Sequence, residues 1–187
     1  MTIYLVSGNA KKLKELQALL PDQGFAPPPF ALDVEETGST FAANARLKAE
    51  AGALAFGGPC LADDSGLCVD ALDGAPGVYS ARYAPGTDAD RTAKLLDALK
   101  GLPRERRTAH FACAIALAYP DGRVIEVEGR CEGLITEAPR GEAGFGYDPV
   151  FENVEHGQTF AELGAEIKNG LSHRAQAVAK LKAVLSS

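Results

Sequence analysis

The sequence predicts an α/β fold, and three observations lead to that prediction. An apolar run over residues 3–6 is followed by a turn signal and by leucines at helical spacing over 11–20, which is the layout strand, tight loop, helix. Residues 40–56 are rich in alanine, the best helix former. Residues 108–119 and 123–132 have strand patterns and are joined by a Pro-Asp-Gly turn.

The caps and the apolar patterns refine these elements. Ser39 or Thr40 is the expected N-cap of the helix over 40–56. The strand over 108–119 is apolar on both faces, which predicts a covered, central position in a sheet, whereas 123–132 alternates with charges and suits a more exposed one. Further helices are expected over 88–99, 159–165 and 175–185.

The bulk composition excludes several classes of protein. The chain has 187 residues, of which 46% are hydrophobic and 24% are charged. This length and composition predict one globular domain, or one domain split into two lobes around a cleft. A net charge of −6 argues against non-specific binding to nucleic acid or to an anionic membrane. If an acidic protein of this kind binds phosphates, it must use a few placed cations or a divalent metal.

The chain shows no targeting or membrane-spanning pattern. Its start, MTIYLVSGNAKK, lacks the basic-then-apolar layout of a signal peptide, and no apolar run approaches about 18 residues. The four cysteines form no C-x-x-C pair and lie in apolar runs, which favours small buried residues in a reducing compartment, with a zinc site or a disulfide as the alternatives. We therefore expect a cytoplasmic protein.

The most unusual stretch is Asp63-Asp64-Ser65-Gly66, which follows an apolar run over 59–62. We expect the strand to end on these residues, because Asp and Gly are poor strand formers and something other than packing must hold them there. Successive strand side chains point to opposite faces, so at most one of Asp63 and Asp64 faces a given cleft. The alternative is an ordinary turn with solvated carboxylates.

Several other polar groups suggest a ligand. Lysines at 11, 12 and 14 lie at the N-terminal end of the first helix, where the helix dipole disfavours cations unless an anion compensates. Phe145 stands between two glycines, which suits stacking on a flat ligand. Asn44 and Lys48 share one helix face, where a solvated stripe is the alternative, and His110 is interpreted as structural.

Taken together, these residues favour a nucleoside triphosphate as the ligand. The carboxylates of two segments suit Mg²⁺ bound together with substrate phosphates. They are Glu35, Glu36, Asp63 and Asp64. Cations come from Lys11 and Lys12, Lys168 and Arg174. Phe145 with the His173-Arg174 pair forms a possible base pocket. Which bond is broken and which base is recognised stay open at this point.

Five ordered motifs now carry a resemblance that covers nearly the whole chain. They are Ser7-Gly8-Asn9…Lys12…Glu15; Glu35-Glu36-Thr37-Gly38…Thr40-Phe41…Asn44-Ala45…Lys48-Ala49; Ala62-Asp63-Asp64-Ser65-Gly66-Leu67 with Gly74-Ala75-Pro76-Gly77-Val78-Tyr79-Ser80-Ala81-Arg82-Tyr83; Gly144-Phe145-Gly146-Tyr147-Asp148-Pro149-Val150-Phe151; and Ser172-His173-Arg174. This set resembles the inosine/xanthosine triphosphate pyrophosphatase family, the Ham1/RdgB-like pyrophosphatases of noncanonical purine nucleoside triphosphates.

The resemblance implies an elongated mixed β-sheet with flanking helices and two lobes around a central cleft, as a single domain over residues 1–187 and usually a homodimer. The implied reaction is the Mg²⁺-dependent hydrolysis of ITP, dITP or XTP to the monophosphate and pyrophosphate, which clears damaged purines from the nucleotide pool.

The resemblance also implies roles for particular residues. Asp64 matches the general base, and Glu35 and Asp64 match the metal-binding carboxylates. The triphosphate loop is matched by Ser7, Gly8, Asn9 and Lys12, with Ser65 and Lys168 as further substrate contacts. The base-binding positions are matched by Phe145, which stacks on the purine, its loop neighbours Gly146 and Tyr147, and Asp148, His173 and Arg174.

The chain departs from the family pattern at Ile167, where glutamate is usual before the lysine, at Ala143, where glycine is more frequent, and at Ser7, where threonine is commoner. Two other functions stay open. One is a nucleotide sensor without catalysis on the same scaffold, and the other is a pyrophosphatase for a broader set of modified nucleotides.

Overall fold

One mixed β-sheet organises the computed structural model, which describes residues 2–21 and 24–186. Within that part of the chain the strand order is β2-β1-β3-β4-β5-β6-β7. The strands are β1 (Ile3–Val6), β2 (Phe25–Ala26), β3 (Cys60–Val69), β4 (Thr108–Ala118), β5 (Val124–Ile135), β6 (Phe151–Asn153) and β7 (Gln158–Thr159). β1 is parallel to β2 and β3, whereas β6 is antiparallel to β5 and β7. The predicted α/β class with a mixed sheet is confirmed.

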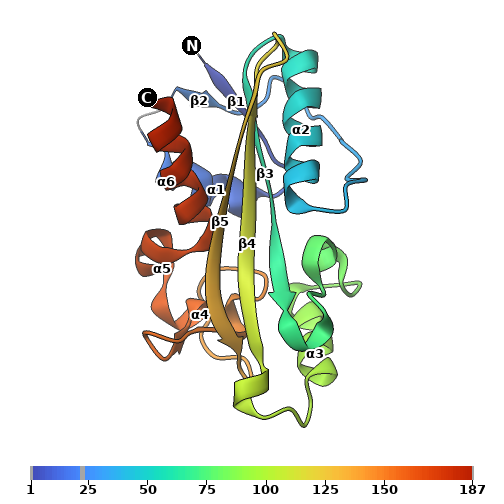
Figure 1. Ribbon diagram of the computed structural model, residues 1–187, viewed down its shortest axis with the longest axis vertical. Helices are drawn as coiled ribbons and strands as arrows, with labels where there is room; N and C mark the ends of the chain where they lie inside the picture. Colours follow the sequence, from blue (N-terminus) through green and yellow to red (C-terminus); the bar gives the residue numbers. More distant parts are fainter. Residues whose placement is uncertain (1, 22–23, 187) are drawn as a thin grey trace. The chain divides into compact units, whose positions relative to one another are not determined.

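The helices flank this sheet (Figure 1). They are α1 (Ala10–Leu19), α2 (Phe41–Phe56), α3 (Asp88–Ala98), α4 (Phe160–Leu163), α5 (Ala165–Leu171) and α6 (His173–Leu185). Capping residues set the starts of the first three, since the side chains of Asn9, Thr40 and Thr87 each accept hydrogen bonds from first-turn amides. Gly57, at φ 65°, ends α2 in the left-handed conformation that favours glycine.

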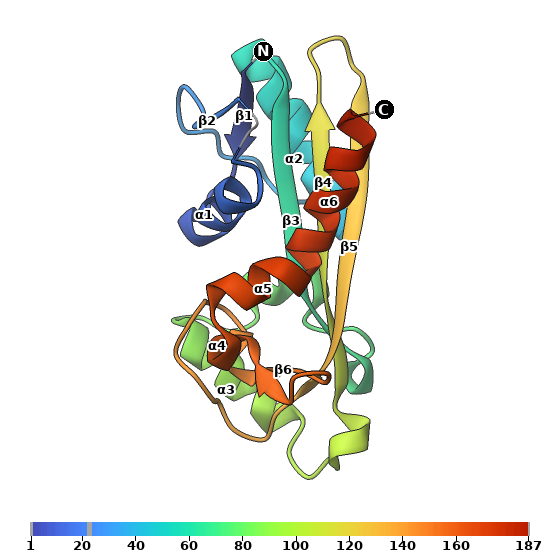
Figure 2. The same ribbon diagram turned by 90° about the vertical axis from the view of Figure 1, so that its left-hand side faces the viewer.

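The chain divides into two compact units, and the first consists of Met1–Ser65, Cys113–Gly129 and His173–Ser187. On one face of its sheet, α1 and α6 bury Leu61 together with Cys113, Ile115 and Leu117 of β4. On the other face, α2 buries Cys60 and Ala62 under a layer of alanines. The figures show α2 on the opposite side of β3 from α1 and α6 (Figures 1 and 2). The strand alternation therefore assigns Asp63 to the α1/α6 face and Asp64 to the α2 face.

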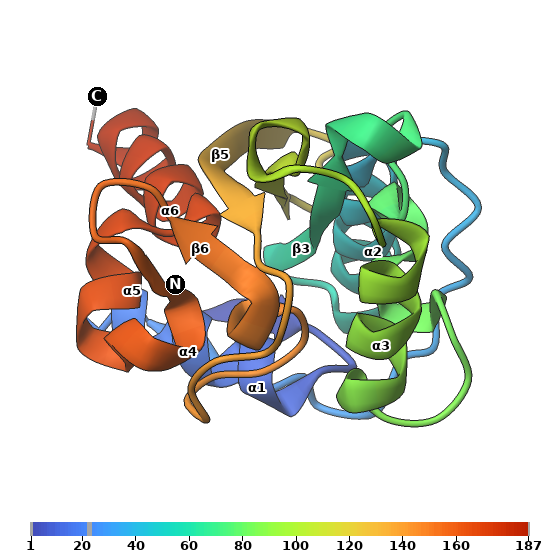
Figure 3. The same cartoon turned by 90° about the horizontal axis from the view of Figure 1, so that it is seen from below.

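The second unit consists of Gly66–Ala112 and Arg130–Ser172. In its core, the rings of Phe111, Phe151 and Phe160 contact one another, with centroids 4.4 to 5.8 Å apart. Each such pair contributes roughly 0.5–1.5 kcal/mol beyond the area that it buries. Leu95 and Leu99 at the end of α3 complete this core. Figure 3 shows β6 beside β5, in agreement with the pairing of Ile135 with Phe151.

The structure corrects the prediction that a strand ends at Asp63-Asp64. β3 continues through both aspartates to Val69, and it lies between β1 and β4 in the sheet. Polar partners of the two carboxylates compensate for the poor strand propensity of aspartate. The last helix also starts earlier than predicted, so that His173 and Arg174 lie in its first turn. α5 occupies most of the stretch between the helices predicted over 159–165 and 175–185.

Two other expectations concern the cysteines and membrane-spanning helices. All four cysteines are free thiols, so neither disulfides nor cysteine pairs form. Across residues 2–21 and 24–186, no helix has the length and apolar character needed to span a membrane. The prediction of one domain with two lobes around a cleft stays a prediction.

Candidate active site

The first candidate site is a carboxylate cluster in the first unit, made of Asp63, Asp64 and Ser65 of β3 with Lys12, Glu15 and Arg174. The exposed fractions of Asp63, Asp64 and Arg174 are only 2%, 5% and 1%. Charged side chains are rarely buried to this degree unless they are paired, so their partners decide what the cluster can do.

Asp63 is bound by cations on the α1/α6 face. Arg174 Nη2 donates to Asp63 Oδ2 at 3.2 Å, and Lys12 Nζ lies 3.9 Å from the same oxygen. Burial by itself raises the pKa of the Asp63 carboxyl, but the charges of Lys12, Arg174 and Lys48 outweigh it and leave the pKa below its usual value. These cations therefore favour the charged form of Asp63.

Arg174 links three elements. Its Nη2 also donates to Ser65 Oγ at 2.8 Å, and its Nη1 donates to Glu15 of α1. Among the described residues the buried Nε of Arg174 has no acceptor. The guanidinium thus holds two carboxylates and a hydroxyl while one buried donor stays without a protein partner.

Asp64 faces α2 instead. Asn44 Nδ2 donates to Asp64 Oδ2 at 3.0 Å, and the Ser65 backbone N–H donates to Asp64 Oδ1, also at 3.0 Å. Burial raises the pKa of the Asp64 carboxyl above its usual value, and the charges of Lys48 and Lys12 and the Asn44 hydrogen bond oppose that rise without cancelling it. The two adjacent aspartates therefore differ both in their partners and in the direction of their pKa shifts.

The loop before α1 differs in part from the sequence prediction. Asn9 Oδ1 accepts from the backbone amides of Lys11 and Lys12, so these helix amides are capped from within the chain. Asn9 N–H in turn donates to Ser7 Oγ. The space beside Gly8 is open, since a Cβ there would meet nothing within 4 Å. The loop can bind an anion through the Lys12 ammonium and the open face at Gly8 rather than through those two capped amides.

The segment before α2 carries the other predicted acids. Glu36 Oε1 accepts from Lys48 Nζ at 2.7 Å, and Glu35 is exposed. In the described part of the chain, no three His, Cys, Asp or Glu side chains gather closely enough to hold a metal ion by themselves. Mg²⁺ is commonly held by one or two carboxylates, with waters and substrate phosphates completing its shell, and Glu35 and Asp64 carry carboxylates of the type that this ion binds.

The second candidate site is the Phe145 loop (residues 143–149) with Lys168, all in the second unit. Asp148 Oδ2 accepts from Lys168 Nζ at 2.7 Å and from the Phe145 backbone N–H at 3.1 Å. The Lys168 ammonium lies 4.7 Å from the centroid of the Phe145 ring, within the range of a cation–π contact. Lys168 is only 3% exposed, whereas its neighbour Ile167 is 43% exposed. The Ile167 departure therefore leaves the lysine–aspartate pair intact.

Two anchors hold this loop to the rest of its unit. Gly146 N–H donates to Asp88 Oδ2 at the start of α3 at 2.8 Å, and Tyr147 Oη donates to the Ser80 carbonyl at 2.8 Å. Gly144 has φ 76° and approaches the Asp148 carboxylate so closely that a side chain would collide with it. Gly144 is thus required by geometry, and the two hydrogen bonds hold the backbone that follows Phe145.

Several of these contacts are not predictable from the sequence pattern. The pattern allows a solvated stripe at Asn44, yet its exposed fraction is zero. Glu15 belongs to one of the ordered motifs, but no pattern assigns a partner to it, to Ser80 or to Asp88. A buried amide in an alanine-rich helix is the signal that could have identified Asn44, since such a group needs polar partners. His173, at the start of α6, is buried as well.

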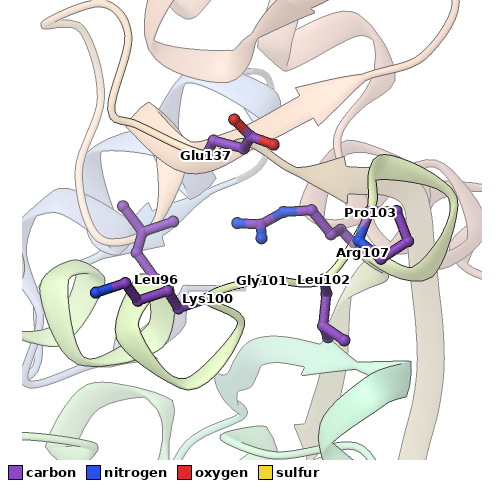
Figure 4. Close-up of a pocket in the computed structure, with 7 residues that line it drawn as sticks. All are labelled: Leu96, Lys100, Gly101, Leu102, Pro103, Arg107 and Glu137. Atoms are coloured by element: carbon purple, nitrogen blue, oxygen red, sulfur yellow. The ribbon is translucent and has the colours of Figure 1, made fainter.

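A separate cavity of about 430 Å³ lies in the second unit (Figure 4). It is lined by Leu96, Lys100, Gly101, Leu102, Pro103, Arg107 and Glu137. Arg107 is satisfied within the protein, because its guanidinium donates to the carbonyls of Leu99, Ile135 and Thr136. None of the predicted site residues lines this cavity, and Arg107 there caps the C-terminal end of α3.

The buried aspartates of β3, with Arg174 of α6 and Lys12 of α1, are carboxylates and cations of the kinds that enzymes of phosphoryl transfer use. Comparison with known proteins agrees. Residues 3–184 match the Ham1 family, and the chain belongs to that family.

Individual relatives cover almost the whole chain. A dITP/XTP pyrophosphatase of Geobacillus kaustophilus is 54% identical, with 96% of this chain and 91% of the relative covered. The solved structure of the Staphylococcus aureus Ham1 protein has a TM-score of 0.89 at 41% identity, over 100% and 98% of the two chains. A nucleoside-triphosphatase / dITP/XTP pyrophosphatase of Mycobacterium abscessus has a TM-score of 0.79 at 45% identity, over 97% and 98%.

Proposed function

We propose that this chain hydrolyses dITP, XTP and ITP to the nucleoside monophosphate and pyrophosphate. The observation that carries the proposal is the 54% identity, over 96% of the chain, to a dITP/XTP pyrophosphatase. The carboxylate cluster and the Phe145 loop with Lys168 support the proposal, since they contain carboxylates, cations and an aromatic ring. The corresponding cellular role is to clear noncanonical purines from the nucleotide pool. The proposed location is the cytoplasm, and the proposed active form is a homodimer.

Asp64 is the proposed general base. It accepts a proton from the water whose oxygen attacks the α-phosphorus; the bond from that phosphorus to the bridging oxygen breaks, and pyrophosphate leaves. The hydrogen bonds from Asn44 and from the Ser65 amide orient the carboxylate. Burial raises the pKa of Asp64, which makes its carboxylate a better proton acceptor than an ordinary exposed aspartate.

The cations of the carboxylate cluster and the loop of Ser7, Gly8 and Asn9 bind the triphosphate in this proposal. Lys12 lies within ion-pair distance of Asp63, next to that loop, and is the proposed phosphate contact, with Ser65 as a further one. Glu35 and Asp64 would hold Mg²⁺, which neutralises charge that develops on the phosphate oxygens.

Recognition of the base is assigned to the Phe145 loop and to the His173-Arg174 pair. Phe145 provides the ring on which the purine stacks, on the loop that includes Gly146, Tyr147 and Asp148, and Lys168 supports it. Hypoxanthine and xanthine present an acceptor oxygen at C6, where adenine presents an amino donor. Arg174 and His173 are the proposed donors to that oxygen, and a site that depends on such buried hydrogen bonds can discriminate by roughly 10⁴-fold.

Product analysis tests the reaction directly. Incubation with ITP and Mg²⁺ is expected to yield IMP and pyrophosphate, whereas IDP and phosphate would refute the proposal. Binding of ITP without turnover would instead identify a nucleotide sensor. A panel of triphosphates, including modified pyrimidines, distinguishes a purine enzyme from one with a broader range.

Asp64→Asn keeps the shape of the side chain and removes its charge, so it is expected to abolish turnover in a folded protein.

A further inference from the structure

Asn44 is the most deeply buried polar residue of α2. It lies in a helix otherwise buried through Ala45, Ala49, Gly52 and Ala53, and none of its surface is exposed. Leaving a buried amide without hydrogen-bond partners destabilises a protein by roughly 1–3 kcal/mol. Both the oxygen and the nitrogen of this amide therefore need partners.

The two ends of the amide have different partners. Asn44 Oδ1 accepts from the backbone N–H of Gly38 at 2.7 Å, and Asn44 Nδ2 donates to Asp64 Oδ2 at 3.0 Å. Because the Gly38 N–H can only donate, it requires the carbonyl oxygen on its side and turns the NH₂ group toward the carboxylate. The orientation of the amide is thus set by the backbone of the preceding turn.

Gly38 is required by this contact. A Cβ at residue 38 would lie 2.6 Å from Asn44 Oδ1 and 2.8 Å from Ala43 Cβ, closer than van der Waals contact allows. The backbone of Gly38 is not in the left-handed region, so the close approach of Asn44, rather than a special φ, excludes a side chain there.

We propose that Asn44, locked by Gly38, is a positioning residue that fixes the Asp64 carboxylate for its role in the reaction. The proposal rests on the proposed function only in that it calls Asp64 the reacting group. One oxygen of the carboxylate is held from β3 itself by the Ser65 amide and the other from α2 by Asn44, so that the carboxylate plane is defined from two elements.

Asn44→Ala is expected to lower kcat for ITP about 10- to 100-fold with little change in KM, since loss of an orienting partner of this kind typically has that effect. Gly38→Ala is expected to act in the same direction, because its new methyl group displaces the Asn44 amide. The losses in kcat should be less than additive in the double variant, since both substitutions break the same link between Gly38 and Asn44.

Matched controls separate positioning from general damage. Asn153→Ala removes another buried asparagine, whose Oδ1 accepts from the His156 N–H, and Gly170→Ala adds a methyl group where a Cβ meets nothing within 4 Å. Both controls should keep the wild-type kcat. Thermal unfolding of every variant verifies that the fold persists at the assay temperature.

A spectroscopic measurement tests the link without nucleotide or metal. In ¹H–¹⁵N spectra, Asp64→Ala should shift the Asn44 Nδ2 resonances, and Asn44→Ala should shift the Gly38 amide. Unchanged resonances, a wild-type kcat in folded Asn44→Ala, or fully additive losses in the double variant would each overturn the proposal. If the wild type hydrolyses no triphosphate, the proposed function fails while the resonance shifts still decide whether Asn44 holds Asp64.

Discussion

At the scale of single residues, burial and partners give two adjacent aspartates different properties. Asp63 keeps its charge through Arg174 and Lys12, and its pKa is lowered, whereas the pKa of Asp64 is raised chiefly by burial. Perturbed pKa values of this kind cluster at functional sites, which agrees with the proposed role of Asp64. Their separation follows from strand alternation, which turns the two side chains to opposite faces of β3.

Replacement of Arg174 tests its place in this arrangement. Arg174→Ala leaves Asp63 and Glu15 without their buried cation, so we expect a loss of about 3–5 kcal/mol in the free energy of unfolding. Among folded molecules, kcat/KM for ITP should fall more than kcat/KM for ATP. Steady-state assays with both nucleotides measure this, and equal losses would assign Arg174 to the phosphates or to positioning of Asp63. Arg174→Lys, which keeps the charge, serves as the comparison.

His110 gives a pH-dependent prediction. Its Nδ1 is buried and, among the described residues, has no partner, so a proton there would be an unsatisfied donor. Burial, with Arg130 adding to it, lowers the pKa of His110 in the folded state, while Glu132 and Asp70 oppose that shift. Because the unfolded chain then binds the proton more readily, stability should fall as the pH drops through about 6.5, the usual histidine value.

Urea unfolding of the wild type and of His110→Gln at pH 5 and pH 7.5 measures this contribution. The variant should lose less stability between the two pH values than the wild type does. An equal loss in both proteins would show that other groups account for the acid sensitivity.

At the scale of elements, helix and strand ends position the site. The side chain of Asp88, the first residue of α3, accepts from the Gly146 amide and pairs with Arg91 at 2.8 Å. A helix start thereby fixes the loop that presents Phe145, just as the first turn of α6 brings Arg174 to β3.

Asp88→Ala should loosen the Phe145 loop. We expect KM for ITP to rise roughly 3- to 10-fold, in line with about 1 kcal/mol for a lost hydrogen bond, with kcat changed less. Asp97→Ala, in the same helix, is the control. A rise in KM that is equal in the two variants would mean that α3 stability, rather than the Gly146 contact, is responsible.

At the scale of the whole molecule, the borders between the two compact units fall inside β3, β4 and β5. Because these strands are continuous in both units, we expect the chain to unfold as one domain. Leu61→Ala in the first unit and Phe111→Ala in the second should each shift the entire transition, by about 2–5 kcal/mol. Tyrosine fluorescence and far-UV circular dichroism should then give coincident curves, and two separate transitions would refute the single domain.

Local pattern was sufficient for much of this molecule. The spacing of leucines and alanines and the capping residues predict α1, α2 and α3 within a residue or so, and the apolar runs predict β1 and β4. The ordered motifs predict the family. These features depend on neighbours three or four positions away, which any reader of the sequence can see.

The partners of the site residues were decided only by the tertiary structure. Arg174 meets Asp63 across 111 positions and Glu15 across 159, and Asn44 meets Asp64 across 20. Such pairs are created by how helices pack on the two faces of the sheet, and the same packing lets β3 continue through residues that by themselves disfavour a strand. Sequence alone therefore determined which polar and charged groups the protein carries, whereas packing decided which of them form hydrogen bonds and ion pairs with one another.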